Sequence, residues 1–136
     1  MNQDNRRILY CHCAYARVVP VEVKQEVLAK LAESDLTFDA VPDLCEMSAR
    51  RDPKLKELAE RGALQIAACY PRAVKWLFAA AKAPLTPDAT EVLNMRVQTA
   101  DDVLVALFSP ELKPNLPEGK ATRPTPMELP NNEVAV

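Results

Sequence analysis

The chain has 136 residues, of which 49% are hydrophobic, and its formal net charge at neutral pH is −2. This length suits a single domain with one hydrophobic core. Acidic and basic residues are mixed along the chain without a basic stripe, which argues against nucleic-acid binding, and every apolar run is far shorter than the roughly 18 residues of a membrane-spanning helix.

Residues 7–108 carry short apolar runs that predict strands, separated by segments whose apolar residues recur three or four positions apart and predict helices. In chain order, we expect a strand at 7–11, a helix at 21–34, a strand at 37–41, a polar connection at 46–51, a helix from Asp52-Pro53 to about Arg61, a strand at 64–68, a helix from Pro71, a strand at 91–97 and a helix after Thr99.

Three residue types mark the ends of these helices. Asp52 before Pro53 is typical of a helix start, and Thr99 is a candidate N-terminal cap for the last helix. Gly62 suits the end of the helix that precedes it. Within the last helix, we expect four apolar side chains to pack: Val103, Leu104, Leu107 and Phe108.

The alternation of strands and helices predicts an α/β domain with a small, open, parallel sheet. We expect about four strands in the order 2-1-3-4, with helices on both faces. This domain would span residues 1–109. Residues 110–136 are polar and rich in proline, which predicts an extended or disordered tail without a packed core, or an extended arm that lies on a partner.

Four cysteines follow the strands of this predicted sheet. Cys11 and Cys13 end the first strand, Cys45 comes a few residues after the second, and Cys69 ends the third. Because the carboxyl ends of parallel strands meet at one edge of a sheet, we expect the four thiols to converge there. Four thiolates suit a soft metal, either zinc or an iron–sulfur cluster. Packed free thiols and a dithiol/disulfide pair remain alternatives.

Three residues next to these cysteines are expected to surround the metal. His12 is the only histidine, and it lies between two candidate ligands; Tyr70 and Arg72 follow Cys69. Helix N-termini after Cys45 and Cys69, together with Arg72, would favour the thiolate form and raise the potential of a cluster, which favours a [4Fe–4S] cluster over zinc.

The start of the chain lacks the apolar core of a signal peptide, so we expect a cytoplasmic protein whose cysteines are reduced. Only two glycines are present. A glycine-rich loop that cradles phosphates therefore cannot be built, and no nucleotide is expected.

The cysteine pattern resembles the N-terminal region of the flavin-binding subunit of heterodisulfide reductase. That region has Cys-His-Cys-Gly after its first strand, a lone cysteine after the second and Ala-Ala-Cys-Ser-Pro-Arg after the third. Residues 11–14, Cys45 and residues 67–72 match this pattern, and Asn94-Met95-Arg96 is similar to its Asn-Ile-Arg. The resemblance covers about residues 7–100. Ala14 replaces the usual Gly, Tyr70 the usual Ser, and residues 74–76 the usual His-Glu-Pro.

The resemblance implies an electron-transfer setting with partner subunits, without the flavin-binding and ferredoxin regions of the larger protein. We therefore expect a small iron–sulfur electron-transfer subunit or accessory protein of a heterodisulfide-reductase-like complex, with one [4Fe–4S] cluster on Cys11, Cys13, Cys45 and Cys69. The tail at 110–136 would contact a neighbouring subunit. The alternatives are a non-catalytic scaffold or assembly domain with structural zinc or free thiols, and a thiol/disulfide carrier.

Overall fold

A computed structural model describes residues 7–14, 19–60, 62–109 and 111–117 of the chain. The elements are, in order, β1 (Arg7–Cys11), α2 (Val21–Glu33), β2 (Phe38–Val41), α3 (Leu44–Ala49), α4 (Lys54–Ala59), β3 (Leu64–Ala68), α5 (Pro71–Ala80), the 3₁₀ turn η1 (Pro87–Ala89), β4 (Thr90–Asn94) and α6 (Ala100–Phe108).

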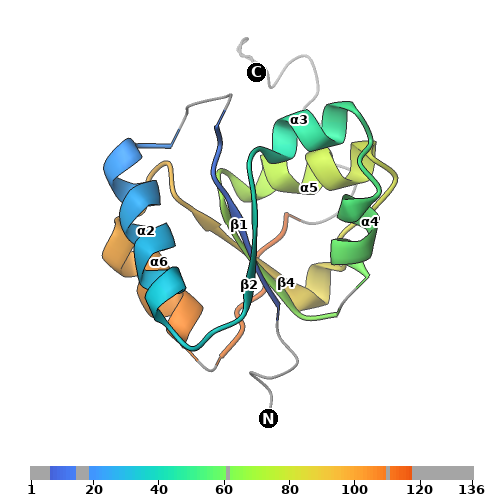
Figure 1. Cartoon of the computed structure of the whole chain (residues 1–136). Helices are drawn as coiled ribbons and strands as arrows, with labels where there is room; N and C mark the ends of the chain where they lie inside the picture. Colours follow the sequence, from blue (N-terminus) through green and yellow to red (C-terminus); the bar gives the residue numbers. More distant parts are fainter. Residues whose placement is uncertain (1–6, 15–18, 61, 110, 118–136) are drawn as a thin grey trace, which may run out of the picture.

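The strands form one parallel sheet in the order β2-β1-β3-β4, which confirms the predicted topology. Figure 1 shows α2 and α6 on one face of the sheet and α3, α4 and α5 on the other. Helix α2 packs against α6, and α5 packs against α3 and α4. The order of the strands reverses between β1 and β3, so the carboxyl ends of these two neighbours lie at the point where α/β sheets hold their ligands.

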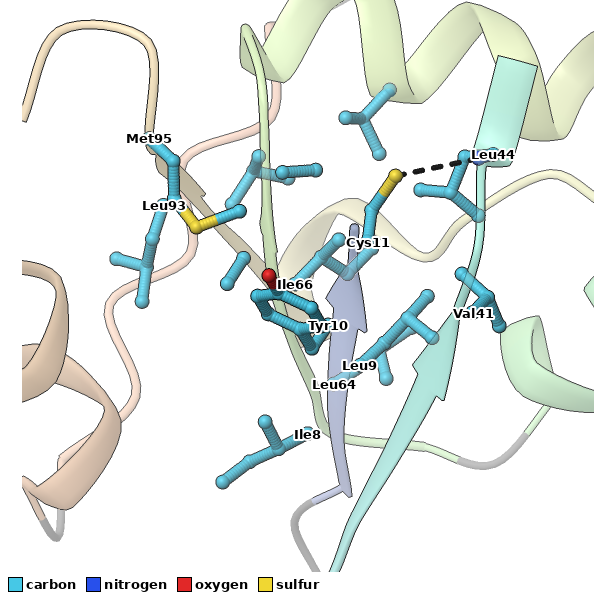
Figure 2. Packing of buried hydrophobic residues seen from close by; sticks show 14 of the residues in the cluster. Ile8, Leu9, Tyr10, Cys11, Val41, Leu44, Leu64, Ile66, Leu93 and Met95 are labelled. Atoms are coloured by element: carbon cyan, nitrogen blue, oxygen red, sulfur yellow. Dashed lines mark hydrogen bonds between the residues drawn. The ribbon is translucent and has the colours of Figure 1, made fainter. Parts of the chain in front are cut away.

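Side chains along β1 alternate between the two faces, as in any strand. Leu9 and Cys11 point toward the face with α3 and α5, whereas Ile8 and Tyr10 point toward the face with α2 and α6 (Figure 2). All four are buried, as are the residues of the neighbouring central strand β3. Burial on both faces explains why these strands are continuous apolar runs.

One of two predicted helix caps is confirmed. The side chain of Thr99 accepts a hydrogen bond from the backbone N–H of Asp102, at 3.1 Å, and so caps α6. Gly62, expected as the C-terminal cap of the preceding helix, lies beyond the C-cap of α4, which is Glu60; its φ of +95° is a backbone conformation that glycine adopts without strain.

The structure differs from the prediction at three places within the domain. Residues Leu44–Ala49, expected as part of a connection, form α3, because the Asp43 carboxylate caps the backbone N–H of Glu46 and Met47 packs into the core. The fourth strand ends at Asn94, where the chain turns. Phe108, expected to pack, is 43% exposed at the end of α6.

The described part of the tail lies against the sheet. The side-chain amide of Asn115 donates to the C=O of Val92 and accepts from its N–H, at 2.9 and 2.8 Å, as a neighbouring strand would. Leu116 is buried in the core, and Lys75 Nζ donates to the C=O of Pro117. Residues 111–117 therefore pack on the edge strand of their own domain. Residues 118–136, which carry most of the expected tail, lie outside the described residues.

Candidate metal centre

The four cysteines line one pocket at the carboxyl ends of β1 and β3. Cys11 is the last residue of β1, Cys13 follows it by two positions, Cys45 lies in the first turn of α3, and Cys69 follows β3 directly. The remaining lining residues are Asp43, Leu44, Ala68, Val74 and Leu77. The strand topology thus brings together the four thiols that the sequence predicts as neighbours, and mostly apolar side chains surround them.

The four thiols differ in their access to solvent. Cys11 and Cys13 are buried, each with 6% of its surface exposed, Cys69 is half-buried, and Cys45 is exposed. All four are free cysteines. Cys45, in the first turn of α3, is thus the lining cysteine with the greatest access to solvent.

The backbone at Cys13 has a φ of +55°, a left-handed conformation that is uncommon for residues other than glycine. Hydrogen bonds from the N–H groups of His12 and Ala14 to the C=O groups of Val41 and Pro42, both 2.9 Å, hold this turn against the end of β2. The turn keeps Cys13 on the same side of the sheet as Cys11, although the strand has already ended.

Backbone N–H groups donate to two of the sulfur atoms. The N–H of Leu44 lies 3.3 Å from Cys11 Sγ (Figure 2), and the N–H of Cys13 donates to the same sulfur. Cys69 Sγ receives hydrogen bonds from its own N–H and from that of Tyr70. Such bonds stabilise a thiolate, and around metal centres they tune the reduction potential.

Burial nevertheless opposes the ionisation of Cys11, Cys45 and Cys69 in the metal-free pocket. It raises the pKa of Cys11 to about 12, against the effect of the two N–H donors. Burial also raises the pKa of Cys45 and of Cys69, and the charge of neighbouring thiolates, Cys13 among them, adds to the shift of each. The N–H groups of Leu44 and Tyr70, at the starts of α3 and α5, lower the pKa of Cys11 and of Cys69 respectively, but burial has the larger effect in the metal-free protein.

The donor set suits a soft metal, because thiols are the ligands that zinc and iron–sulfur clusters share. The space between the lining side chains is about 20 Å³, comparable to that of one water molecule. Within the described residues, no three His, Cys, Asp or Glu side chains are already arranged as metal ligands. Binding a cluster would therefore require the thiols to rotate, and the exposed Cys45 has the most freedom to do so.

The three residues expected beside the metal lie elsewhere than in the pocket lining. His12 points away from the cysteines: its Nδ1 lies 2.9 Å from the Tyr10 hydroxyl, on the α2 side of β1. Tyr70 is exposed, and Arg72 is exposed in the first turn of α5.

Arg96 is a residue of the site that was not predicted from the sequence. Its guanidinium carbon lies 4.8 Å from the centre of the Tyr70 ring, a cation–π contact, and its charge lowers the pKa of Cys69 against the larger effect of burial. The residues after β4 reach the same edge of the sheet as Cys69, so strand topology could have identified this cation.

Comparisons with models of protein families, with curated proteins and with solved structures found no match to this chain. The resemblance to the flavin-binding subunit of heterodisulfide reductase therefore stays a prediction from the residues alone. No helix in the described part of the chain is both long enough and apolar enough to cross a membrane.

Proposed function

We propose that this protein is a small electron-transfer subunit that holds one [4Fe–4S] cluster with Cys11, Cys13, Cys45 and Cys69. The observation that carries the proposal is the gathering of all four cysteines, from three separate segments, around one pocket. When bound, such a cluster takes up and releases one electron. The protein would work in the cytoplasm, where thiols stay reduced and available to metal.

The backbone at Cys13 argues that these thiols do more than fill space. A left-handed residue other than glycine costs on the order of 1 kcal/mol or more. Packing alone does not account for a cysteine there, because a small hydrophobic residue with relaxed backbone would fill the same volume. A requirement for a sulfur atom at position 13 does account for a cysteine with this backbone conformation.

The surroundings of the sulfurs support an electron carrier. Two N–H groups donate to Cys11 Sγ and two to Cys69 Sγ, and Arg96 adds positive charge near Cys69. Both features favour the reduced, more negative form of a cluster and so raise its potential. The buried side of the pocket excludes water, whereas the exposed Cys45 offers a route at the surface for an electron to reach a partner. That partner could be a component of a heterodisulfide-reductase-like complex.

A single zinc ion in a structural role is the second candidate, and the small volume of the pocket favours it. A scaffold or assembly domain would need only such a closed set of four thiolates. The two candidates differ in sulfide content, colour and redox behaviour, so one preparation distinguishes them.

The test is metal and sulfide analysis, with a visible spectrum, of the full chain purified without oxygen. The proposal predicts about four iron and four sulfide per chain and a spectrum that dithionite bleaches. Cys45→Ser should lose most of this iron, whereas Val105→Ser, a matched change of an exposed residue on α6, should keep it. One zinc without sulfide would support the second candidate, and a metal-free chain would contradict both.

A further inference from the structure

A second hollow lies on the opposite side of β1 from the cysteine pocket and shares none of its lining residues. It measures about 360 Å³ and is lined by His12, Ala14, Val19, Val21 and Lys24. This volume lies in the range of small-molecule sites, which is roughly 300 to 1,000 Å³. The hollow opens at the carboxyl end of β1, next to the point where the strand order reverses and where α/β folds bind ligands.

Lys24 is the unusual residue of this hollow. Only 8% of it is exposed, and its Nζ donates to the C=O of His12 at 2.9 Å. Among the described residues, no carboxylate forms an ion pair with it. Residues 15–18, which connect Ala14 to Val19, contain neither aspartate nor glutamate. Within the described part of the chain this largely buried lysine has no counter-charge, which is costly, so its position favours an anion.

Other groups around the hollow are polar and held in place. The Tyr10 hydroxyl donates to the C=O of Lys24 and contacts His12 Nδ1, which fixes the imidazole ring at the wall. Val21 begins the 13-residue helix α2, and the Pro20 that precedes it supplies no side-chain cap for the first N–H groups. Glu22 also lies in this first turn, but it is exposed and does not line the hollow.

We propose that the hollow binds the phosphate group of a small molecule, with the Lys24 ammonium as its counter-charge. A lysine binds phosphate as a point charge, as the lysine of phosphate-binding loops does. The uncapped start of a helix adds N–H groups and a partial positive charge that suit the same ligand. The scarcity of glycine excludes a glycine-rich loop that cradles a nucleotide. It does not exclude this phosphate site, because the Lys24 side chain supplies its main charge.

The experiment measures the thermal unfolding midpoint of the full chain, as purified, in inorganic phosphate and in chloride at equal ionic strength. A specific site predicts that the midpoint rises and saturates at millimolar phosphate, because ligand binding follows a saturating law. General stabilisation by phosphate grows steadily into the molar range. Lys24→Met, which keeps the aliphatic length of the side chain, should abolish the saturating rise. Lys30→Met removes an exposed lysine of the same helix and should leave it intact.

A wild-type midpoint that does not saturate, or that rises equally in chloride, would overturn the proposal without reference to any variant. An equal saturating rise in Lys24→Met would overturn it too. If Lys24→Met does not fold, Lys24→Arg replaces it. Arginine keeps the charge, and the proposal predicts that this variant retains a saturating rise, so its absence would contradict the assigned role. The site contains no cysteine, so none of the proposed metal ligands takes part in phosphate binding.

Discussion

Raising the pH of the metal-free protein from 8 to 10 should destabilise it through Cys11. Burial raises the pKa of this thiol from its ordinary 9.0 to about 12. In this range the unfolded chain releases the Cys11 proton, whereas the folded chain keeps it. The stabilising contribution is therefore complete below pH 9 and is lost as the pH rises toward 12. Each pH unit within this window costs about 1.4 kcal/mol.

The expected loss from Cys11 is thus about 1.4 kcal/mol between pH 8 and pH 10, because the unfolded thiol titrates near the middle of this interval. Against a total stability of about 5 to 15 kcal/mol, such a change is measurable. The assay is urea unfolding at pH 8, 9 and 10 with a reductant and a chelator. Burial also raises the pKa of Tyr10 above its ordinary 10.0, so pH 10 is the upper limit that keeps the cysteines dominant.

Cys11→Ala isolates this contribution. The variant loses packing at every pH, but that loss cancels when its stability at pH 8 is compared with its stability at pH 10. The wild type should lose about 1.4 kcal/mol more over this interval than Cys11→Ala, whereas Cys45→Ala, which removes an exposed thiol, should keep most of the wild-type pH dependence. Equal slopes for wild type and Cys11→Ala would refute the buried, protonated state of this thiol.

Three further predictions test the pocket and the sheet edge. Because thiols must lose protons to bind metal, the apparent affinity for Co²⁺, followed by its absorbance, should rise steeply between pH 6.5 and 7.5; a constant affinity would argue against thiolate ligands. Arg96→Gln should raise the pKa of Cys69 and slow its alkylation, measured by mass spectrometry, whereas Arg72→Gln should not; equal rates in both would contradict the assigned effect of Arg96. Asn115→Ala should lower the free energy of unfolding by about 1 to 3 kcal/mol, because it leaves two backbone groups of β4 unpaired. Lys113→Ala, whose described contact is made by its backbone N–H, is the control, and an equal loss in both would refute the pairing.

The sheet was predictable because each strand is a short apolar run with a clear boundary. Alternation of strands with helices then leaves few topologies, and the right-handed crossover rule selects among them. Local signals of the same kind identified the cap at Thr99 and the left-handed Gly62, since each depends only on a few neighbouring residues.

Helix α3 was not predictable from its own residues. It has six residues, too few to be stable alone, and several of them are polar. A local cap from Asp43 and a tertiary contact hold it in place, and the tertiary contact is the hydrogen bond that the Ser48 hydroxyl donates to the C=O of Leu77 on α5 at 2.7 Å. The packing of Asn115 and Leu116 on β4 could not be predicted from neighbouring residues either, because the β4 residues that they contact lie more than twenty positions away in the sequence.

The candidate site likewise has some features that follow from neighbouring residues and others that depend on residues far away in the sequence. That Cys11 and Cys69 meet follows from the ends of neighbouring strands, and that His12 faces away follows from alternation along β1. The raised pKa values of Cys11, Cys45 and Cys69 depend instead on burial, which a reading of neighbouring residues does not reveal. The cation that acts on Cys69 is Arg96, which follows β4 and lies over the ring of Tyr70; Arg72, the arginine next to Cys69 in the sequence, has no such effect on that cysteine.

The raised pKa values of three thiols and the left-handed backbone of Cys13 have the same explanation if the pocket binds a metal. A pocket built for a reactive thiolate would lower its pKa with nearby cations, as redox-active cysteines require. This pocket instead buries sulfur among apolar side chains and holds one cysteine in a left-handed turn. Both features cost free energy in the metal-free chain, and a ligand that binds several sulfurs at once would offset both. A metal centre is therefore favoured over a dithiol carrier, whose two thiols would gain nothing from the other two.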